Sequence, residues 1–354
     1  MYTSPRRVVC ESEGLEKLRY QRGRVRAMKA VIWTRYGSPE VLEIHEVDKP
    51  SPKKNEVLIK VHATTVETGD CELRRYRLHN YFYMLFRPYF GLFRPRLVKT
   101  LGQQLSGEVE AVGSSVTKFK VGDAIFAGAE KMGATAEYIC LPENDAIVIK
   151  PDKISFEEAA AVTVGGINAL HFLKKAKIQP KQKVLIYGST GAIGTFAVQL
   201  AKHLGAEVTA VCSGGKIELV KSLGADHIID YTSQSLSDVN QSYDVIFDTI
   251  GKSPYAESLS VLKPGGIYLL ANPTLRQQLR SYWTHLTSNK RTTCRLANNS
   301  AEDLNYLKQL IEQNTLKVIV DRSYPMEQIV EAHHYVEQGH KNGNVVITLA
   351  REII

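Results

Sequence analysis

Cysteine is scarce in this sequence of 354 residues, and the five present form neither a CxxC motif nor the spacing of a disulfide framework. They are Cys10, Cys71, Cys140, Cys212 and Cys294. Long apolar runs are also missing: the most apolar stretch, YFYMLF at 81–86, ends at Arg87 and Pro88, far short of the roughly 18 residues of a membrane span. These absences argue against a structural zinc lobe and a membrane span. They favour a reducing compartment, so a cytoplasmic location is predicted.

Positive charge is concentrated near the start of the chain. The formal net charge is +8, and residues 1–27 hold seven Arg or Lys against three Glu. This segment has no apolar core of a secretory signal, and its three acids count against a mitochondrial presequence. We expect a poorly ordered basic extension at 1–27, before a natural start near Met28. The remaining chain is only mildly basic, so nucleic acid is not expected as a partner.

Two kinds of pattern follow one another along the chain. From Met28 to about residue 154, short β-branched runs are separated by Gly, Pro and Asn turns, which predicts a β-rich unit. From Ser155, which forms a capping-box pattern with Glu158, strands alternate with helices as in parallel α/β proteins. The strands predicted in this part are 184–188, 207–211, 227–231, 244–248 and 266–271.

The pattern changes again after about residue 298. Here we expect a helix at 301–313, a strand at 317–321, a helix at 325–338 and a final strand at 344–349. The simplest organisation is a doubly wound domain at 155–298 inserted into a β-rich domain that is built from 28–154 and 299–354.

A glycine-rich turn, YGSTGAIG at 187–194, lies between a predicted buried strand and an amphipathic helix. Glycine lets the backbone turn sharply and approach a pyrophosphate, and the start of the helix offers free N–H groups and a favourable dipole to an anion. The pattern G-x-x-G-x-x-G is common by itself. Its place between strand and helix favours a dinucleotide-binding loop over a tight turn with packing glycines.

An acidic residue is missing where an NAD-selective site would place one, at the tip of the second strand. The sequence there reads VCSGGK at 211–216. Ser213 and Lys216 supply a hydroxyl and a cation, which suit the 2′-phosphate of NADPH, and Tyr231 after the third strand could lie beside the adenine. In the alternative reading, Lys216 is a solvated lysine at a helix start and Tyr231 is an aromatic residue of an edge strand.

The sequence resembles the medium-chain dehydrogenase/reductase superfamily, and within it the zinc-free quinone oxidoreductase branch. The resemblance covers nearly all of 28–354. Its specific parts are MKAVIW, GEVEAVGSSVTKFKVGDAIFA, SFEEAAAV, GSTGAIG, VKSLGADHIIDY, FDTIG, LKPGG and GHKNGNVVITL. It implies an α/β fold in which a GroES-like β-rich catalytic domain carries an inserted Rossmann cofactor domain with a doubly wound parallel sheet. It also implies a homodimer.

The resemblance further implies NADPH as the cofactor and a set of residues that hold it. A basic residue after the second strand and a tyrosine after the third bind the extra phosphate, while the turns after the fourth and fifth strands line the nicotinamide. The candidate cofactor-binding residues are Ser189, Thr190, Gly191, Ala192, Ile193, Ser213, Lys216, Tyr231, Thr249, Ile250, Gly251, Ala271, Asn272 and Asn344.

The departures from zinc-dependent relatives concern the metal. Those relatives carry Cys and a His-Glu pair where this chain has Glu67, Gln103 and Gln104. A Gln amide is a poor ligand and a catalytic zinc needs about three good donors, so no metal is expected. The zinc-free relatives usually have Asn near the position of Glu67, which alters the polar surroundings of the nicotinamide.

Without a Lewis acid, the substrate must bring its own activation, which points to a quinone or an α,β-unsaturated carbonyl that accepts hydride from NADPH. Glu67, Asp70 and Tyr76 are candidate polar contacts of this catalytic site, and each is equally well explained as structural. The aromatic segment 76–99 is expected to be either a substrate wall, a packed or dimer-forming insertion, or a membrane-surface patch. The alternative function is a low-turnover NADPH-binding scaffold or RNA-binding protein that retains the fold.

Overall fold

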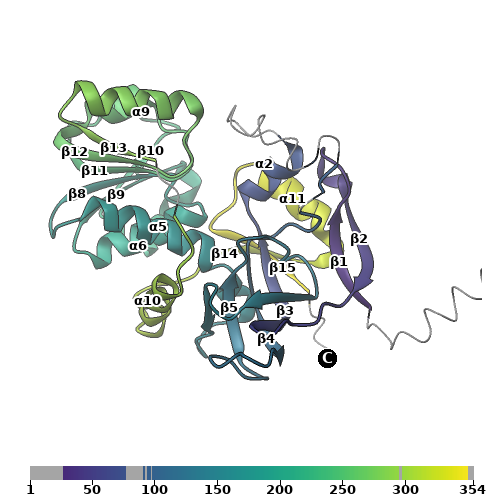
Figure 1. Cartoon of the computed structure of the whole chain (residues 1–354). Coiled ribbons are helices and arrows are strands. Elements are labelled where there is room, and N and C mark those ends of the chain that lie inside the picture. The colour runs from purple at the N-terminus through teal and green to yellow at the C-terminus, as the bar shows by residue number, and fades with distance from the viewer. Residues whose placement is uncertain (1–26, 77–90, 92–93, 97, 295–296, 350–354) are drawn as a thin grey trace, which may run out of the picture.

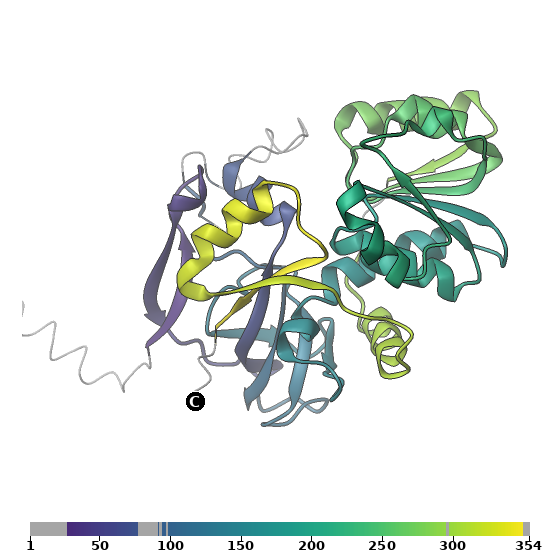
Figure 2. The ribbon, with the colours of Figure 1, turned by 180° about the vertical axis from the view of Figure 1, so that it is seen from behind.

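The computed structural model describes residues 27–76, 91, 94–96, 98–294 and 297–349. The basic extension predicted at 1–27 lies outside these residues except for Ala27, and so does most of the aromatic segment 76–99. In the described ranges, no helix is both long and apolar enough to cross a membrane. Two β-sheets form the framework of two neighbouring units, which Figures 1 and 2 show side by side.

The first unit is built on a seven-stranded sheet with the order β14-β15-β3-β4-β5-β7, in which β6 pairs with β3. Its pairings are antiparallel except for the parallel pair β14–β15. The late strand β15 pairs with the early strand β3, so the two ends of the chain contribute to one sheet. A separate antiparallel pair, β1–β2, lies beside it. The strands are β1 (Ala27–Trp33), β2 (Leu42–Asp48), β3 (Glu56–Val66), β4 (Gln104–Val112), β5 (Ala124–Gly128), β6 (Tyr138–Pro142), β7 (Ile147–Ile149), β14 (Val320–Pro325) and β15 (Asn344–Thr348).

The second unit is a six-stranded, wholly parallel sheet with the order β10-β9-β8-β11-β12-β13. In chain order this is 3-2-1-4-5-6, the order of a Rossmann fold, whose switch point lies between β8 and β11. The predicted fold class, a GroES-like β-rich domain with a Rossmann domain, is confirmed. The strands are β8 (Lys183–Tyr187), β9 (Glu207–Cys212), β10 (His227–Asp230), β11 (Tyr243–Asp248), β12 (Leu262–Leu270) and β13 (Arg291–Thr293).

Helices cover both faces of the parallel sheet, as its buried strands require. In Figure 1, α5 and α6 lie on one face and α9 on the other. The helices of the structure are α2 (Thr68–Arg75), α4 (Phe156–Ala160), α5 (Thr163–Ala176), α6 (Ala192–His203), α7 (Ile217–Ser222), α8 (Tyr255–Ser260), α9 (Leu275–Thr287), α10 (Ala301–Glu312) and α11 (Ile329–Glu337). Short 3-10 helices span Pro39–Val41, Gly214–Lys216, Leu236–Asp238 and Met326–Gln328.

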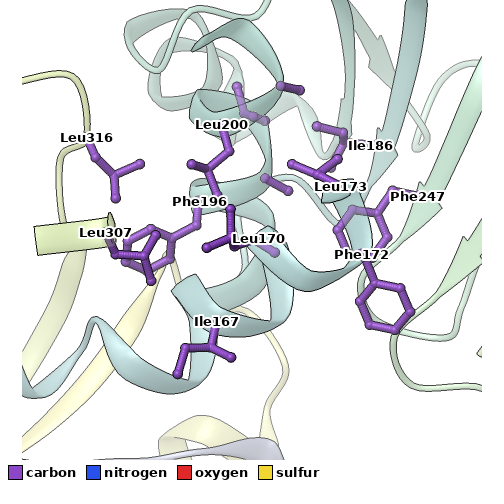
Figure 3. Close-up of a cluster of buried hydrophobic side chains, with 14 of the residues drawn as sticks. Ile167, Leu170, Phe172, Leu173, Ile186, Phe196, Leu200, Phe247, Leu307 and Leu316 are labelled. Carbon is purple, nitrogen blue, oxygen red and sulfur yellow. The ribbon is translucent and has the colours of Figure 1, made fainter. Parts of the chain in front are cut away.

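The larger core of the cofactor unit fills the space between α5, α6 and the sheet. Phe172, Phe196 and Phe247 are fully buried there, and Leu307 of α10 joins them (Figure 3). The helices α5 and α6 approach closely because α5 carries Gly165, where an added Cβ would lie 2.6 Å from the carbonyl oxygen of Ala192. This contact places the start of α5 beside the start of α6.

Most predicted elements are present, including the capping box of Ser155 and Glu158, whose two hydrogen bonds measure 2.9 and 3.1 Å. The strand predicted at 317–321 is displaced, since β14 runs from Val320 to Pro325. The cause is the Gln199 side chain, which bonds both the N–H and the carbonyl of Lys317 and withdraws them from strand pairing. The domain limits at 155 and 299 stay predictions, and α10 contacts both α5 and β7.

Candidate active site

The phosphate loop follows β8 at the switch point of the parallel sheet. Gly188 has a φ of +77°, and an added Cβ on Gly194 would lie 2.1 Å from the Gly188 carbonyl oxygen, so neither position accepts a larger residue without displacement. Gly191 is the N-cap of α6, whose first-turn N–H groups have no acceptor within the helix. Ser189 donates its hydroxyl to the Val211 carbonyl at 2.9 Å and anchors the loop to β9. This glycine cradle at a helix start fits a pyrophosphate.

The second strand itself carries no carboxylate at its tip, but the Asp230 carboxylate at the end of β10 lies beside Gly214 in the loop after β9. β9 ends at Cys212, and Ser213 precedes the short helix Gly214–Lys216. The N–H of Tyr231 donates to the Cys212 carbonyl at 3.1 Å, so Tyr231 and Ser213 lie at adjacent strand ends, as the sequence predicted. The exposed Tyr231 ring is 6.3 Å from that of Tyr187. Both line a pocket of about 370 Å³ at the carboxyl ends of β8, β9 and β10.

Lys216 lies differently from the expectation. Its ammonium donates to the backbone carbonyls of His340 at 2.7 Å and Lys341 at 3.2 Å, and Lys216 does not line the Tyr231 pocket. Burial lowers the pKa of Lys216, and the nearby Asp321 carboxylate opposes that shift. Lys216 therefore links the second strand of the cofactor unit to the loop that precedes β15.

This loop, 340–343, is a part of the site that sequence reasoning did not name. Gly343 donates its N–H to the Thr190 carbonyl at 2.7 Å, and Gly191 and Gly343 form a parallel bridge. Gly343 has a φ of +71°, and an added Cβ would lie 2.3 Å from the Ile319 carbonyl oxygen. The signals in the sequence were the pair of glycines that brackets HKN and the place of this loop within GHKNGNVVITL, a stretch that carries the family resemblance.

The turn after β11 is organised by a buried carboxylate that was also missed. Asp248 accepts hydrogen bonds of 2.8–3.0 Å from the backbone N–H groups of Ile250, Gly251 and Ser253. The next strand end joins this turn, since Asn272 donates its amide to the Thr249 carbonyl at 3.0 Å. The predicted nicotinamide-side residues after β11 and β12 are thus brought together.

Ala271 and Asn344 are the two remaining candidates for the nicotinamide side, and they lie beside this turn and in β15. Ala271 donates its N–H to the Asp248 carbonyl at 3.0 Å. Asn344 is fully buried in β15 and donates to the Ile319 carbonyl at 3.2 Å, whereas its amide oxygen has no hydrogen-bond partner among the placed residues. Because buried polar atoms are normally hydrogen-bonded, the Asn344 amide oxygen suits a hydrogen-bond donor supplied by a ligand.

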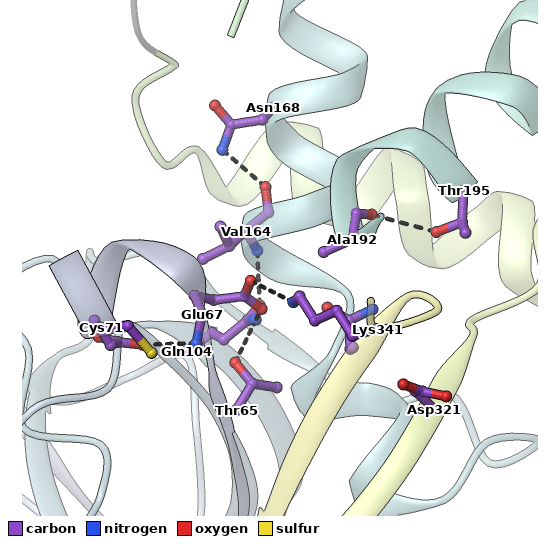
Figure 4. Close-up of polar contacts among 12 residues, drawn as sticks. Thr65, Glu67, Cys71, Gln104, Val164, Asn168, Ala192, Thr195, Asp321 and Lys341 are labelled. Carbon is purple, nitrogen blue, oxygen red and sulfur yellow. Dashed lines mark hydrogen bonds and ion pairs between the residues drawn. The ribbon is translucent and has the colours of Figure 1, made fainter. Parts of the chain in front are cut away.

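Glu67 and Lys341, which both belong to the catalytic unit, form a buried ion pair (Figure 4). The distance from Lys341 Nζ to Glu67 Oε2 is 3.1 Å, and the two side chains are 9% and 10% exposed. Gln104 donates its amide to Glu67 Oε1 at 3.1 Å and accepts from the N–H of Val164, at the start of α5, at 2.7 Å. A continuous polar chain therefore runs from the catalytic sheet to the cofactor unit.

Asp70 holds the backbone of Glu67 in place through a hydrogen bond. It is fully buried, its Oδ2 accepts from the Glu67 backbone N–H at 2.9 Å, and its Oδ1 accepts from Gly102 at 3.4 Å. Burial raises the pKa of Asp70 to about 7. Tyr76 ends α2 with a φ of 52°, and its ring packs 4.8 Å from Tyr36. The structure thus brings Glu67 and Asp70 together and places Tyr76 in an aromatic cluster.

The side chains at the positions where zinc-dependent relatives carry their ligands do not fit a catalytic zinc. Both ends of the Gln104 amide are engaged, the amino group also donating to Thr65 Oγ1 at 2.6 Å. Within the part of the chain that the structure places, no group of three or more His, Cys, Asp or Glu could hold a metal ion. Cys71 contacts His333 Nδ1 at 3.3 Å, and burial raises the pKa of its thiol to about 12. The expectation of a metal-free enzyme stays a prediction.

Fold and site together define a class of two-unit proteins in which a dinucleotide-binding Rossmann sheet faces a GroES-like unit. Comparisons with known families agree with this class. Residues 53–152 match the family described as alcohol dehydrogenase GroES-like domain, and residues 223–347 match the family described as zinc-binding dehydrogenase.

Curated relatives cover most of the chain. A 2-methylene-furan-3-one reductase of Solanum lycopersicum is 32% identical over 90% of this chain and 79% of its own. An NADPH-dependent alkenal/one oxidoreductase of Arabidopsis thaliana, chloroplastic by name, is 30% identical over the same shares. The quinone oxidoreductase structure from Coxiella burnetii superposes with a TM-score of 0.83 at 28% identity, over 92% of this chain and 100% of that one.

The chain belongs to the medium-chain dehydrogenase/reductase superfamily, in its quinone oxidoreductase and alkenal reductase branch. The predicted family is confirmed. Relatives are named as chloroplastic and as mitochondrial proteins, so the cytoplasmic location of this chain stays a prediction.

Proposed function

We propose that this protein is an NADPH-dependent reductase that transfers hydride to a quinone or an α,β-unsaturated carbonyl compound. The observation that carries the proposal is the meeting of the phosphate loop with the Glu67–Lys341 pair, through the loop 340–343. Relatives support the acceptor class, since two are named as reductases of a methylene-furanone and of alkenals and enones.

The cofactor would lie along the carboxyl edge of the parallel sheet. The N–H groups at the start of α6 would hold the pyrophosphate, and the Tyr187–Tyr231 pocket would take the adenosine end. Ser213 would donate to the 2′-phosphate, and Lys216 would reach it by exchanging its two carbonyl partners for an anion. The Asp248-braced turn and Asn272 would line the nicotinamide, beside the unpaired amide oxygen of Asn344.

The bound cofactor supplies a hydride to the conjugated end of the acceptor. The acceptor then carries a new C–H bond and a negative charge on oxygen, as an enolate or a hydroquinone anion, which a proton from water neutralises. Lys341 is the cation of the site that would face this oxygen, and Glu67 would hold its ammonium in place at 3.1 Å. Asp70 is a positioning residue, since it touches Glu67 and Gly102 rather than the cleft.

Cofactor choice is tested with NADPH and NADH consumption against quinones, enones and simple aldehydes. We expect turnover of the conjugated acceptors with NADPH, and a loss of roughly 10- to 100-fold in kcat/KM for NADPH in Lys216→Glu, the value of one charge-assisted hydrogen bond. NADH use should persist in that variant. The matched control is Lys221→Glu, because Lys221 lies on α7 and is exposed and paired with Glu218.

Two results would contradict the proposal. Comparable use of NADH and NADPH by the wild type would overturn the cofactor assignment. Tight NADPH binding without turnover of any conjugated acceptor would favour a nucleotide-binding scaffold instead. A loss of NADH use together with NADPH use in Lys216→Glu would show that the loop 340–343, which Lys216 holds, is displaced or that the variant is misfolded, and thermal unfolding separates the two.

A further inference from the structure

Helix α9 presents an apolar face to solvent. Leu279, Tyr282, Trp283 and Leu286 are 57%, 64%, 64% and 59% exposed. They follow the spacing i, i+3, i+4, i+7, which puts them on one side of the helix. Ten large apolar residues are exposed among those the structure describes, and these four gather on a single helix face. Such a cluster marks an interaction surface more often than a scatter of single residues does.

The side of α9 that faces the protein is polar. Gln277 and Ser281 are its buried residues, and Gln277 donates to the Gly251 carbonyl at 3.2 Å. Ser281 offers its carbonyl to the Thr292 hydroxyl at 2.8 Å, and Thr284 shares a 3.0 Å hydrogen bond with Tyr255. At 3.6 residues per turn these positions lie opposite the apolar four. Hydrogen bonds therefore attach the polar side of α9 to the cofactor unit, and its four apolar residues stay outside the hydrophobic core.

The sequence that contains this helix carries charge of one sign. Between Glu257 and Glu302 the sequence contains no Asp or Glu. The same stretch contains Arg276, Arg280, Lys290, Arg291 and Arg295, besides Lys263, whose charge is paired with Asp244 at 2.8 Å. Arg276 and Arg280 are exposed and lie along one edge of the apolar face, and Arg291 is exposed on the strand that follows the helix. The surface thus pairs an apolar stripe rich in Trp, Tyr and Leu with a cationic border.

From these observations we infer that α9 docks this protein on an anionic lipid membrane surface. The helix would lie in the plane of the interface, with its apolar stripe among the acyl chains and its arginines on the headgroups. Trp and Tyr are suited to that boundary because each has an apolar ring and a polar group. A second copy of the chain is a poorer occupant, since a two-fold contact through α9 would bring the same arginines against each other.

Vesicle binding by the full-length protein tests the inference. We expect flotation with vesicles of phosphatidylcholine containing about a third phosphatidylglycerol, little flotation with phosphatidylcholine alone, and weakening at high salt. The chain has two tryptophans, and Trp33 is buried whereas Trp283 is exposed. Binding should therefore shift the tryptophan emission to shorter wavelength in the wild type, and this shift should vanish in Trp283→Phe while some binding remains.

Two variants separate the apolar and the cationic contributions. Leu279→Ser with Leu286→Ser should weaken binding at least about tenfold, and Arg276→Gln with Arg280→Gln should weaken binding to anionic vesicles roughly thirtyfold. Val121→Ser is the matched control, since Val121 is equally exposed but lies on the catalytic unit. Thermal unfolding should be unchanged in all of them.

Three outcomes would overturn the inference. One is absence of wild-type binding to the anionic vesicles, and another is equal loss in Val121→Ser. The third is a wild-type dimer that becomes monomeric in the double leucine variant without any vesicle binding, which would assign the face to a second copy. NADPH oxidation with soluble acceptors is measured separately, so failure of this inference and failure of the proposed activity are distinguishable.

Discussion

Replacing Lys341 by methionine tests the ion pair at the centre of the site. Lys341 and Glu67 are each about nine-tenths buried, and their charged atoms are 3.1 Å apart. In Lys341→Met the Glu67 carboxylate keeps the neutral amide of Gln104 as a partner but loses its cation. Removing one member of a buried pair typically costs about 3–5 kcal/mol of unfolding free energy, because the remaining charge is uncompensated.

We expect a cost near the lower end, about 3 kcal/mol, because the Gln104 amide still donates to the Glu67 carboxylate. Glu67→Gln alone should cost about 2 kcal/mol, since the flexible lysine can turn toward water or a carbonyl. The double variant removes both charges and should recover at least about 1.5 kcal/mol of the summed losses. NADPH oxidation should fall in every one of these variants.

Urea unfolding at about neutral pH measures this double-mutant cycle. The control is Lys53→Met, which breaks the pair with Glu56, and Lys53 is 80% exposed. That exposed pair should contribute less than about 1 kcal/mol. Additive losses for Lys341 and Glu67, with a coupling below about 0.5 kcal/mol, would refute the argument that the two charges depend on each other.

Three further predictions follow from single residues. The folded chain holds the Asp70 proton up to about pH 7 while the unfolded chain releases it near its ordinary pKa, so wild-type stability should fall as pH rises through this window. Asp70→Asn should flatten that slope in urea titrations, and an unchanged slope would disprove the assignment. Gly251→Ala should lower Tm and weaken NADPH binding because its Cβ would lie 2.0 Å from the Asn272 carbonyl oxygen. The control Gly265→Ala has a similar positive φ, 75° against 69°, but open space around its Cβ, so it should cost only about 1 kcal/mol. Cys71 should resist thiol reagents at about pH 8 until the protein unfolds, since burial raises its pKa; rapid labelling of the folded protein at Cys71 would contradict this.

The fold was largely predictable because its strands carry dense local signals. The runs VLIY and DVIF form buried parallel strands that are followed by glycine turns. Their predicted bounds agree with β8 and β11 to within one residue at each end. The edge strand β13 was missed, since its sequence RTT has neither apolar character nor alternation. The strand β12 begins at Leu262, earlier than predicted, because LKPGG reads locally as a turn.

The site was less predictable, since its decisive contacts join distant parts of the chain. Gly343 meets Thr190 and Lys216 meets His340 across more than a hundred residues, and no local pattern encodes such pairs. The absence of an acid at the tip of β9 was readable because it depends on one strand and its loop. The role of Asp248 was not predicted, because the motif FDTIG indicates nicotinamide contacts only for the residues after Asp248 and does not encode the hydrogen bonds that its carboxylate accepts.

The position of β15 has a consequence for shortened or tagged versions of this protein. This strand joins β14 to β3 inside the seven-stranded sheet, although it contains some of the last residues of the chain. A truncation before Gly339 would remove the partner that joins the edge strand β14 to β3, together with the backbone that meets Thr190. Deletions that remove β15 should therefore abolish folding and nucleotide binding together. A tag should be added after residue 354 and should not replace residues of β15.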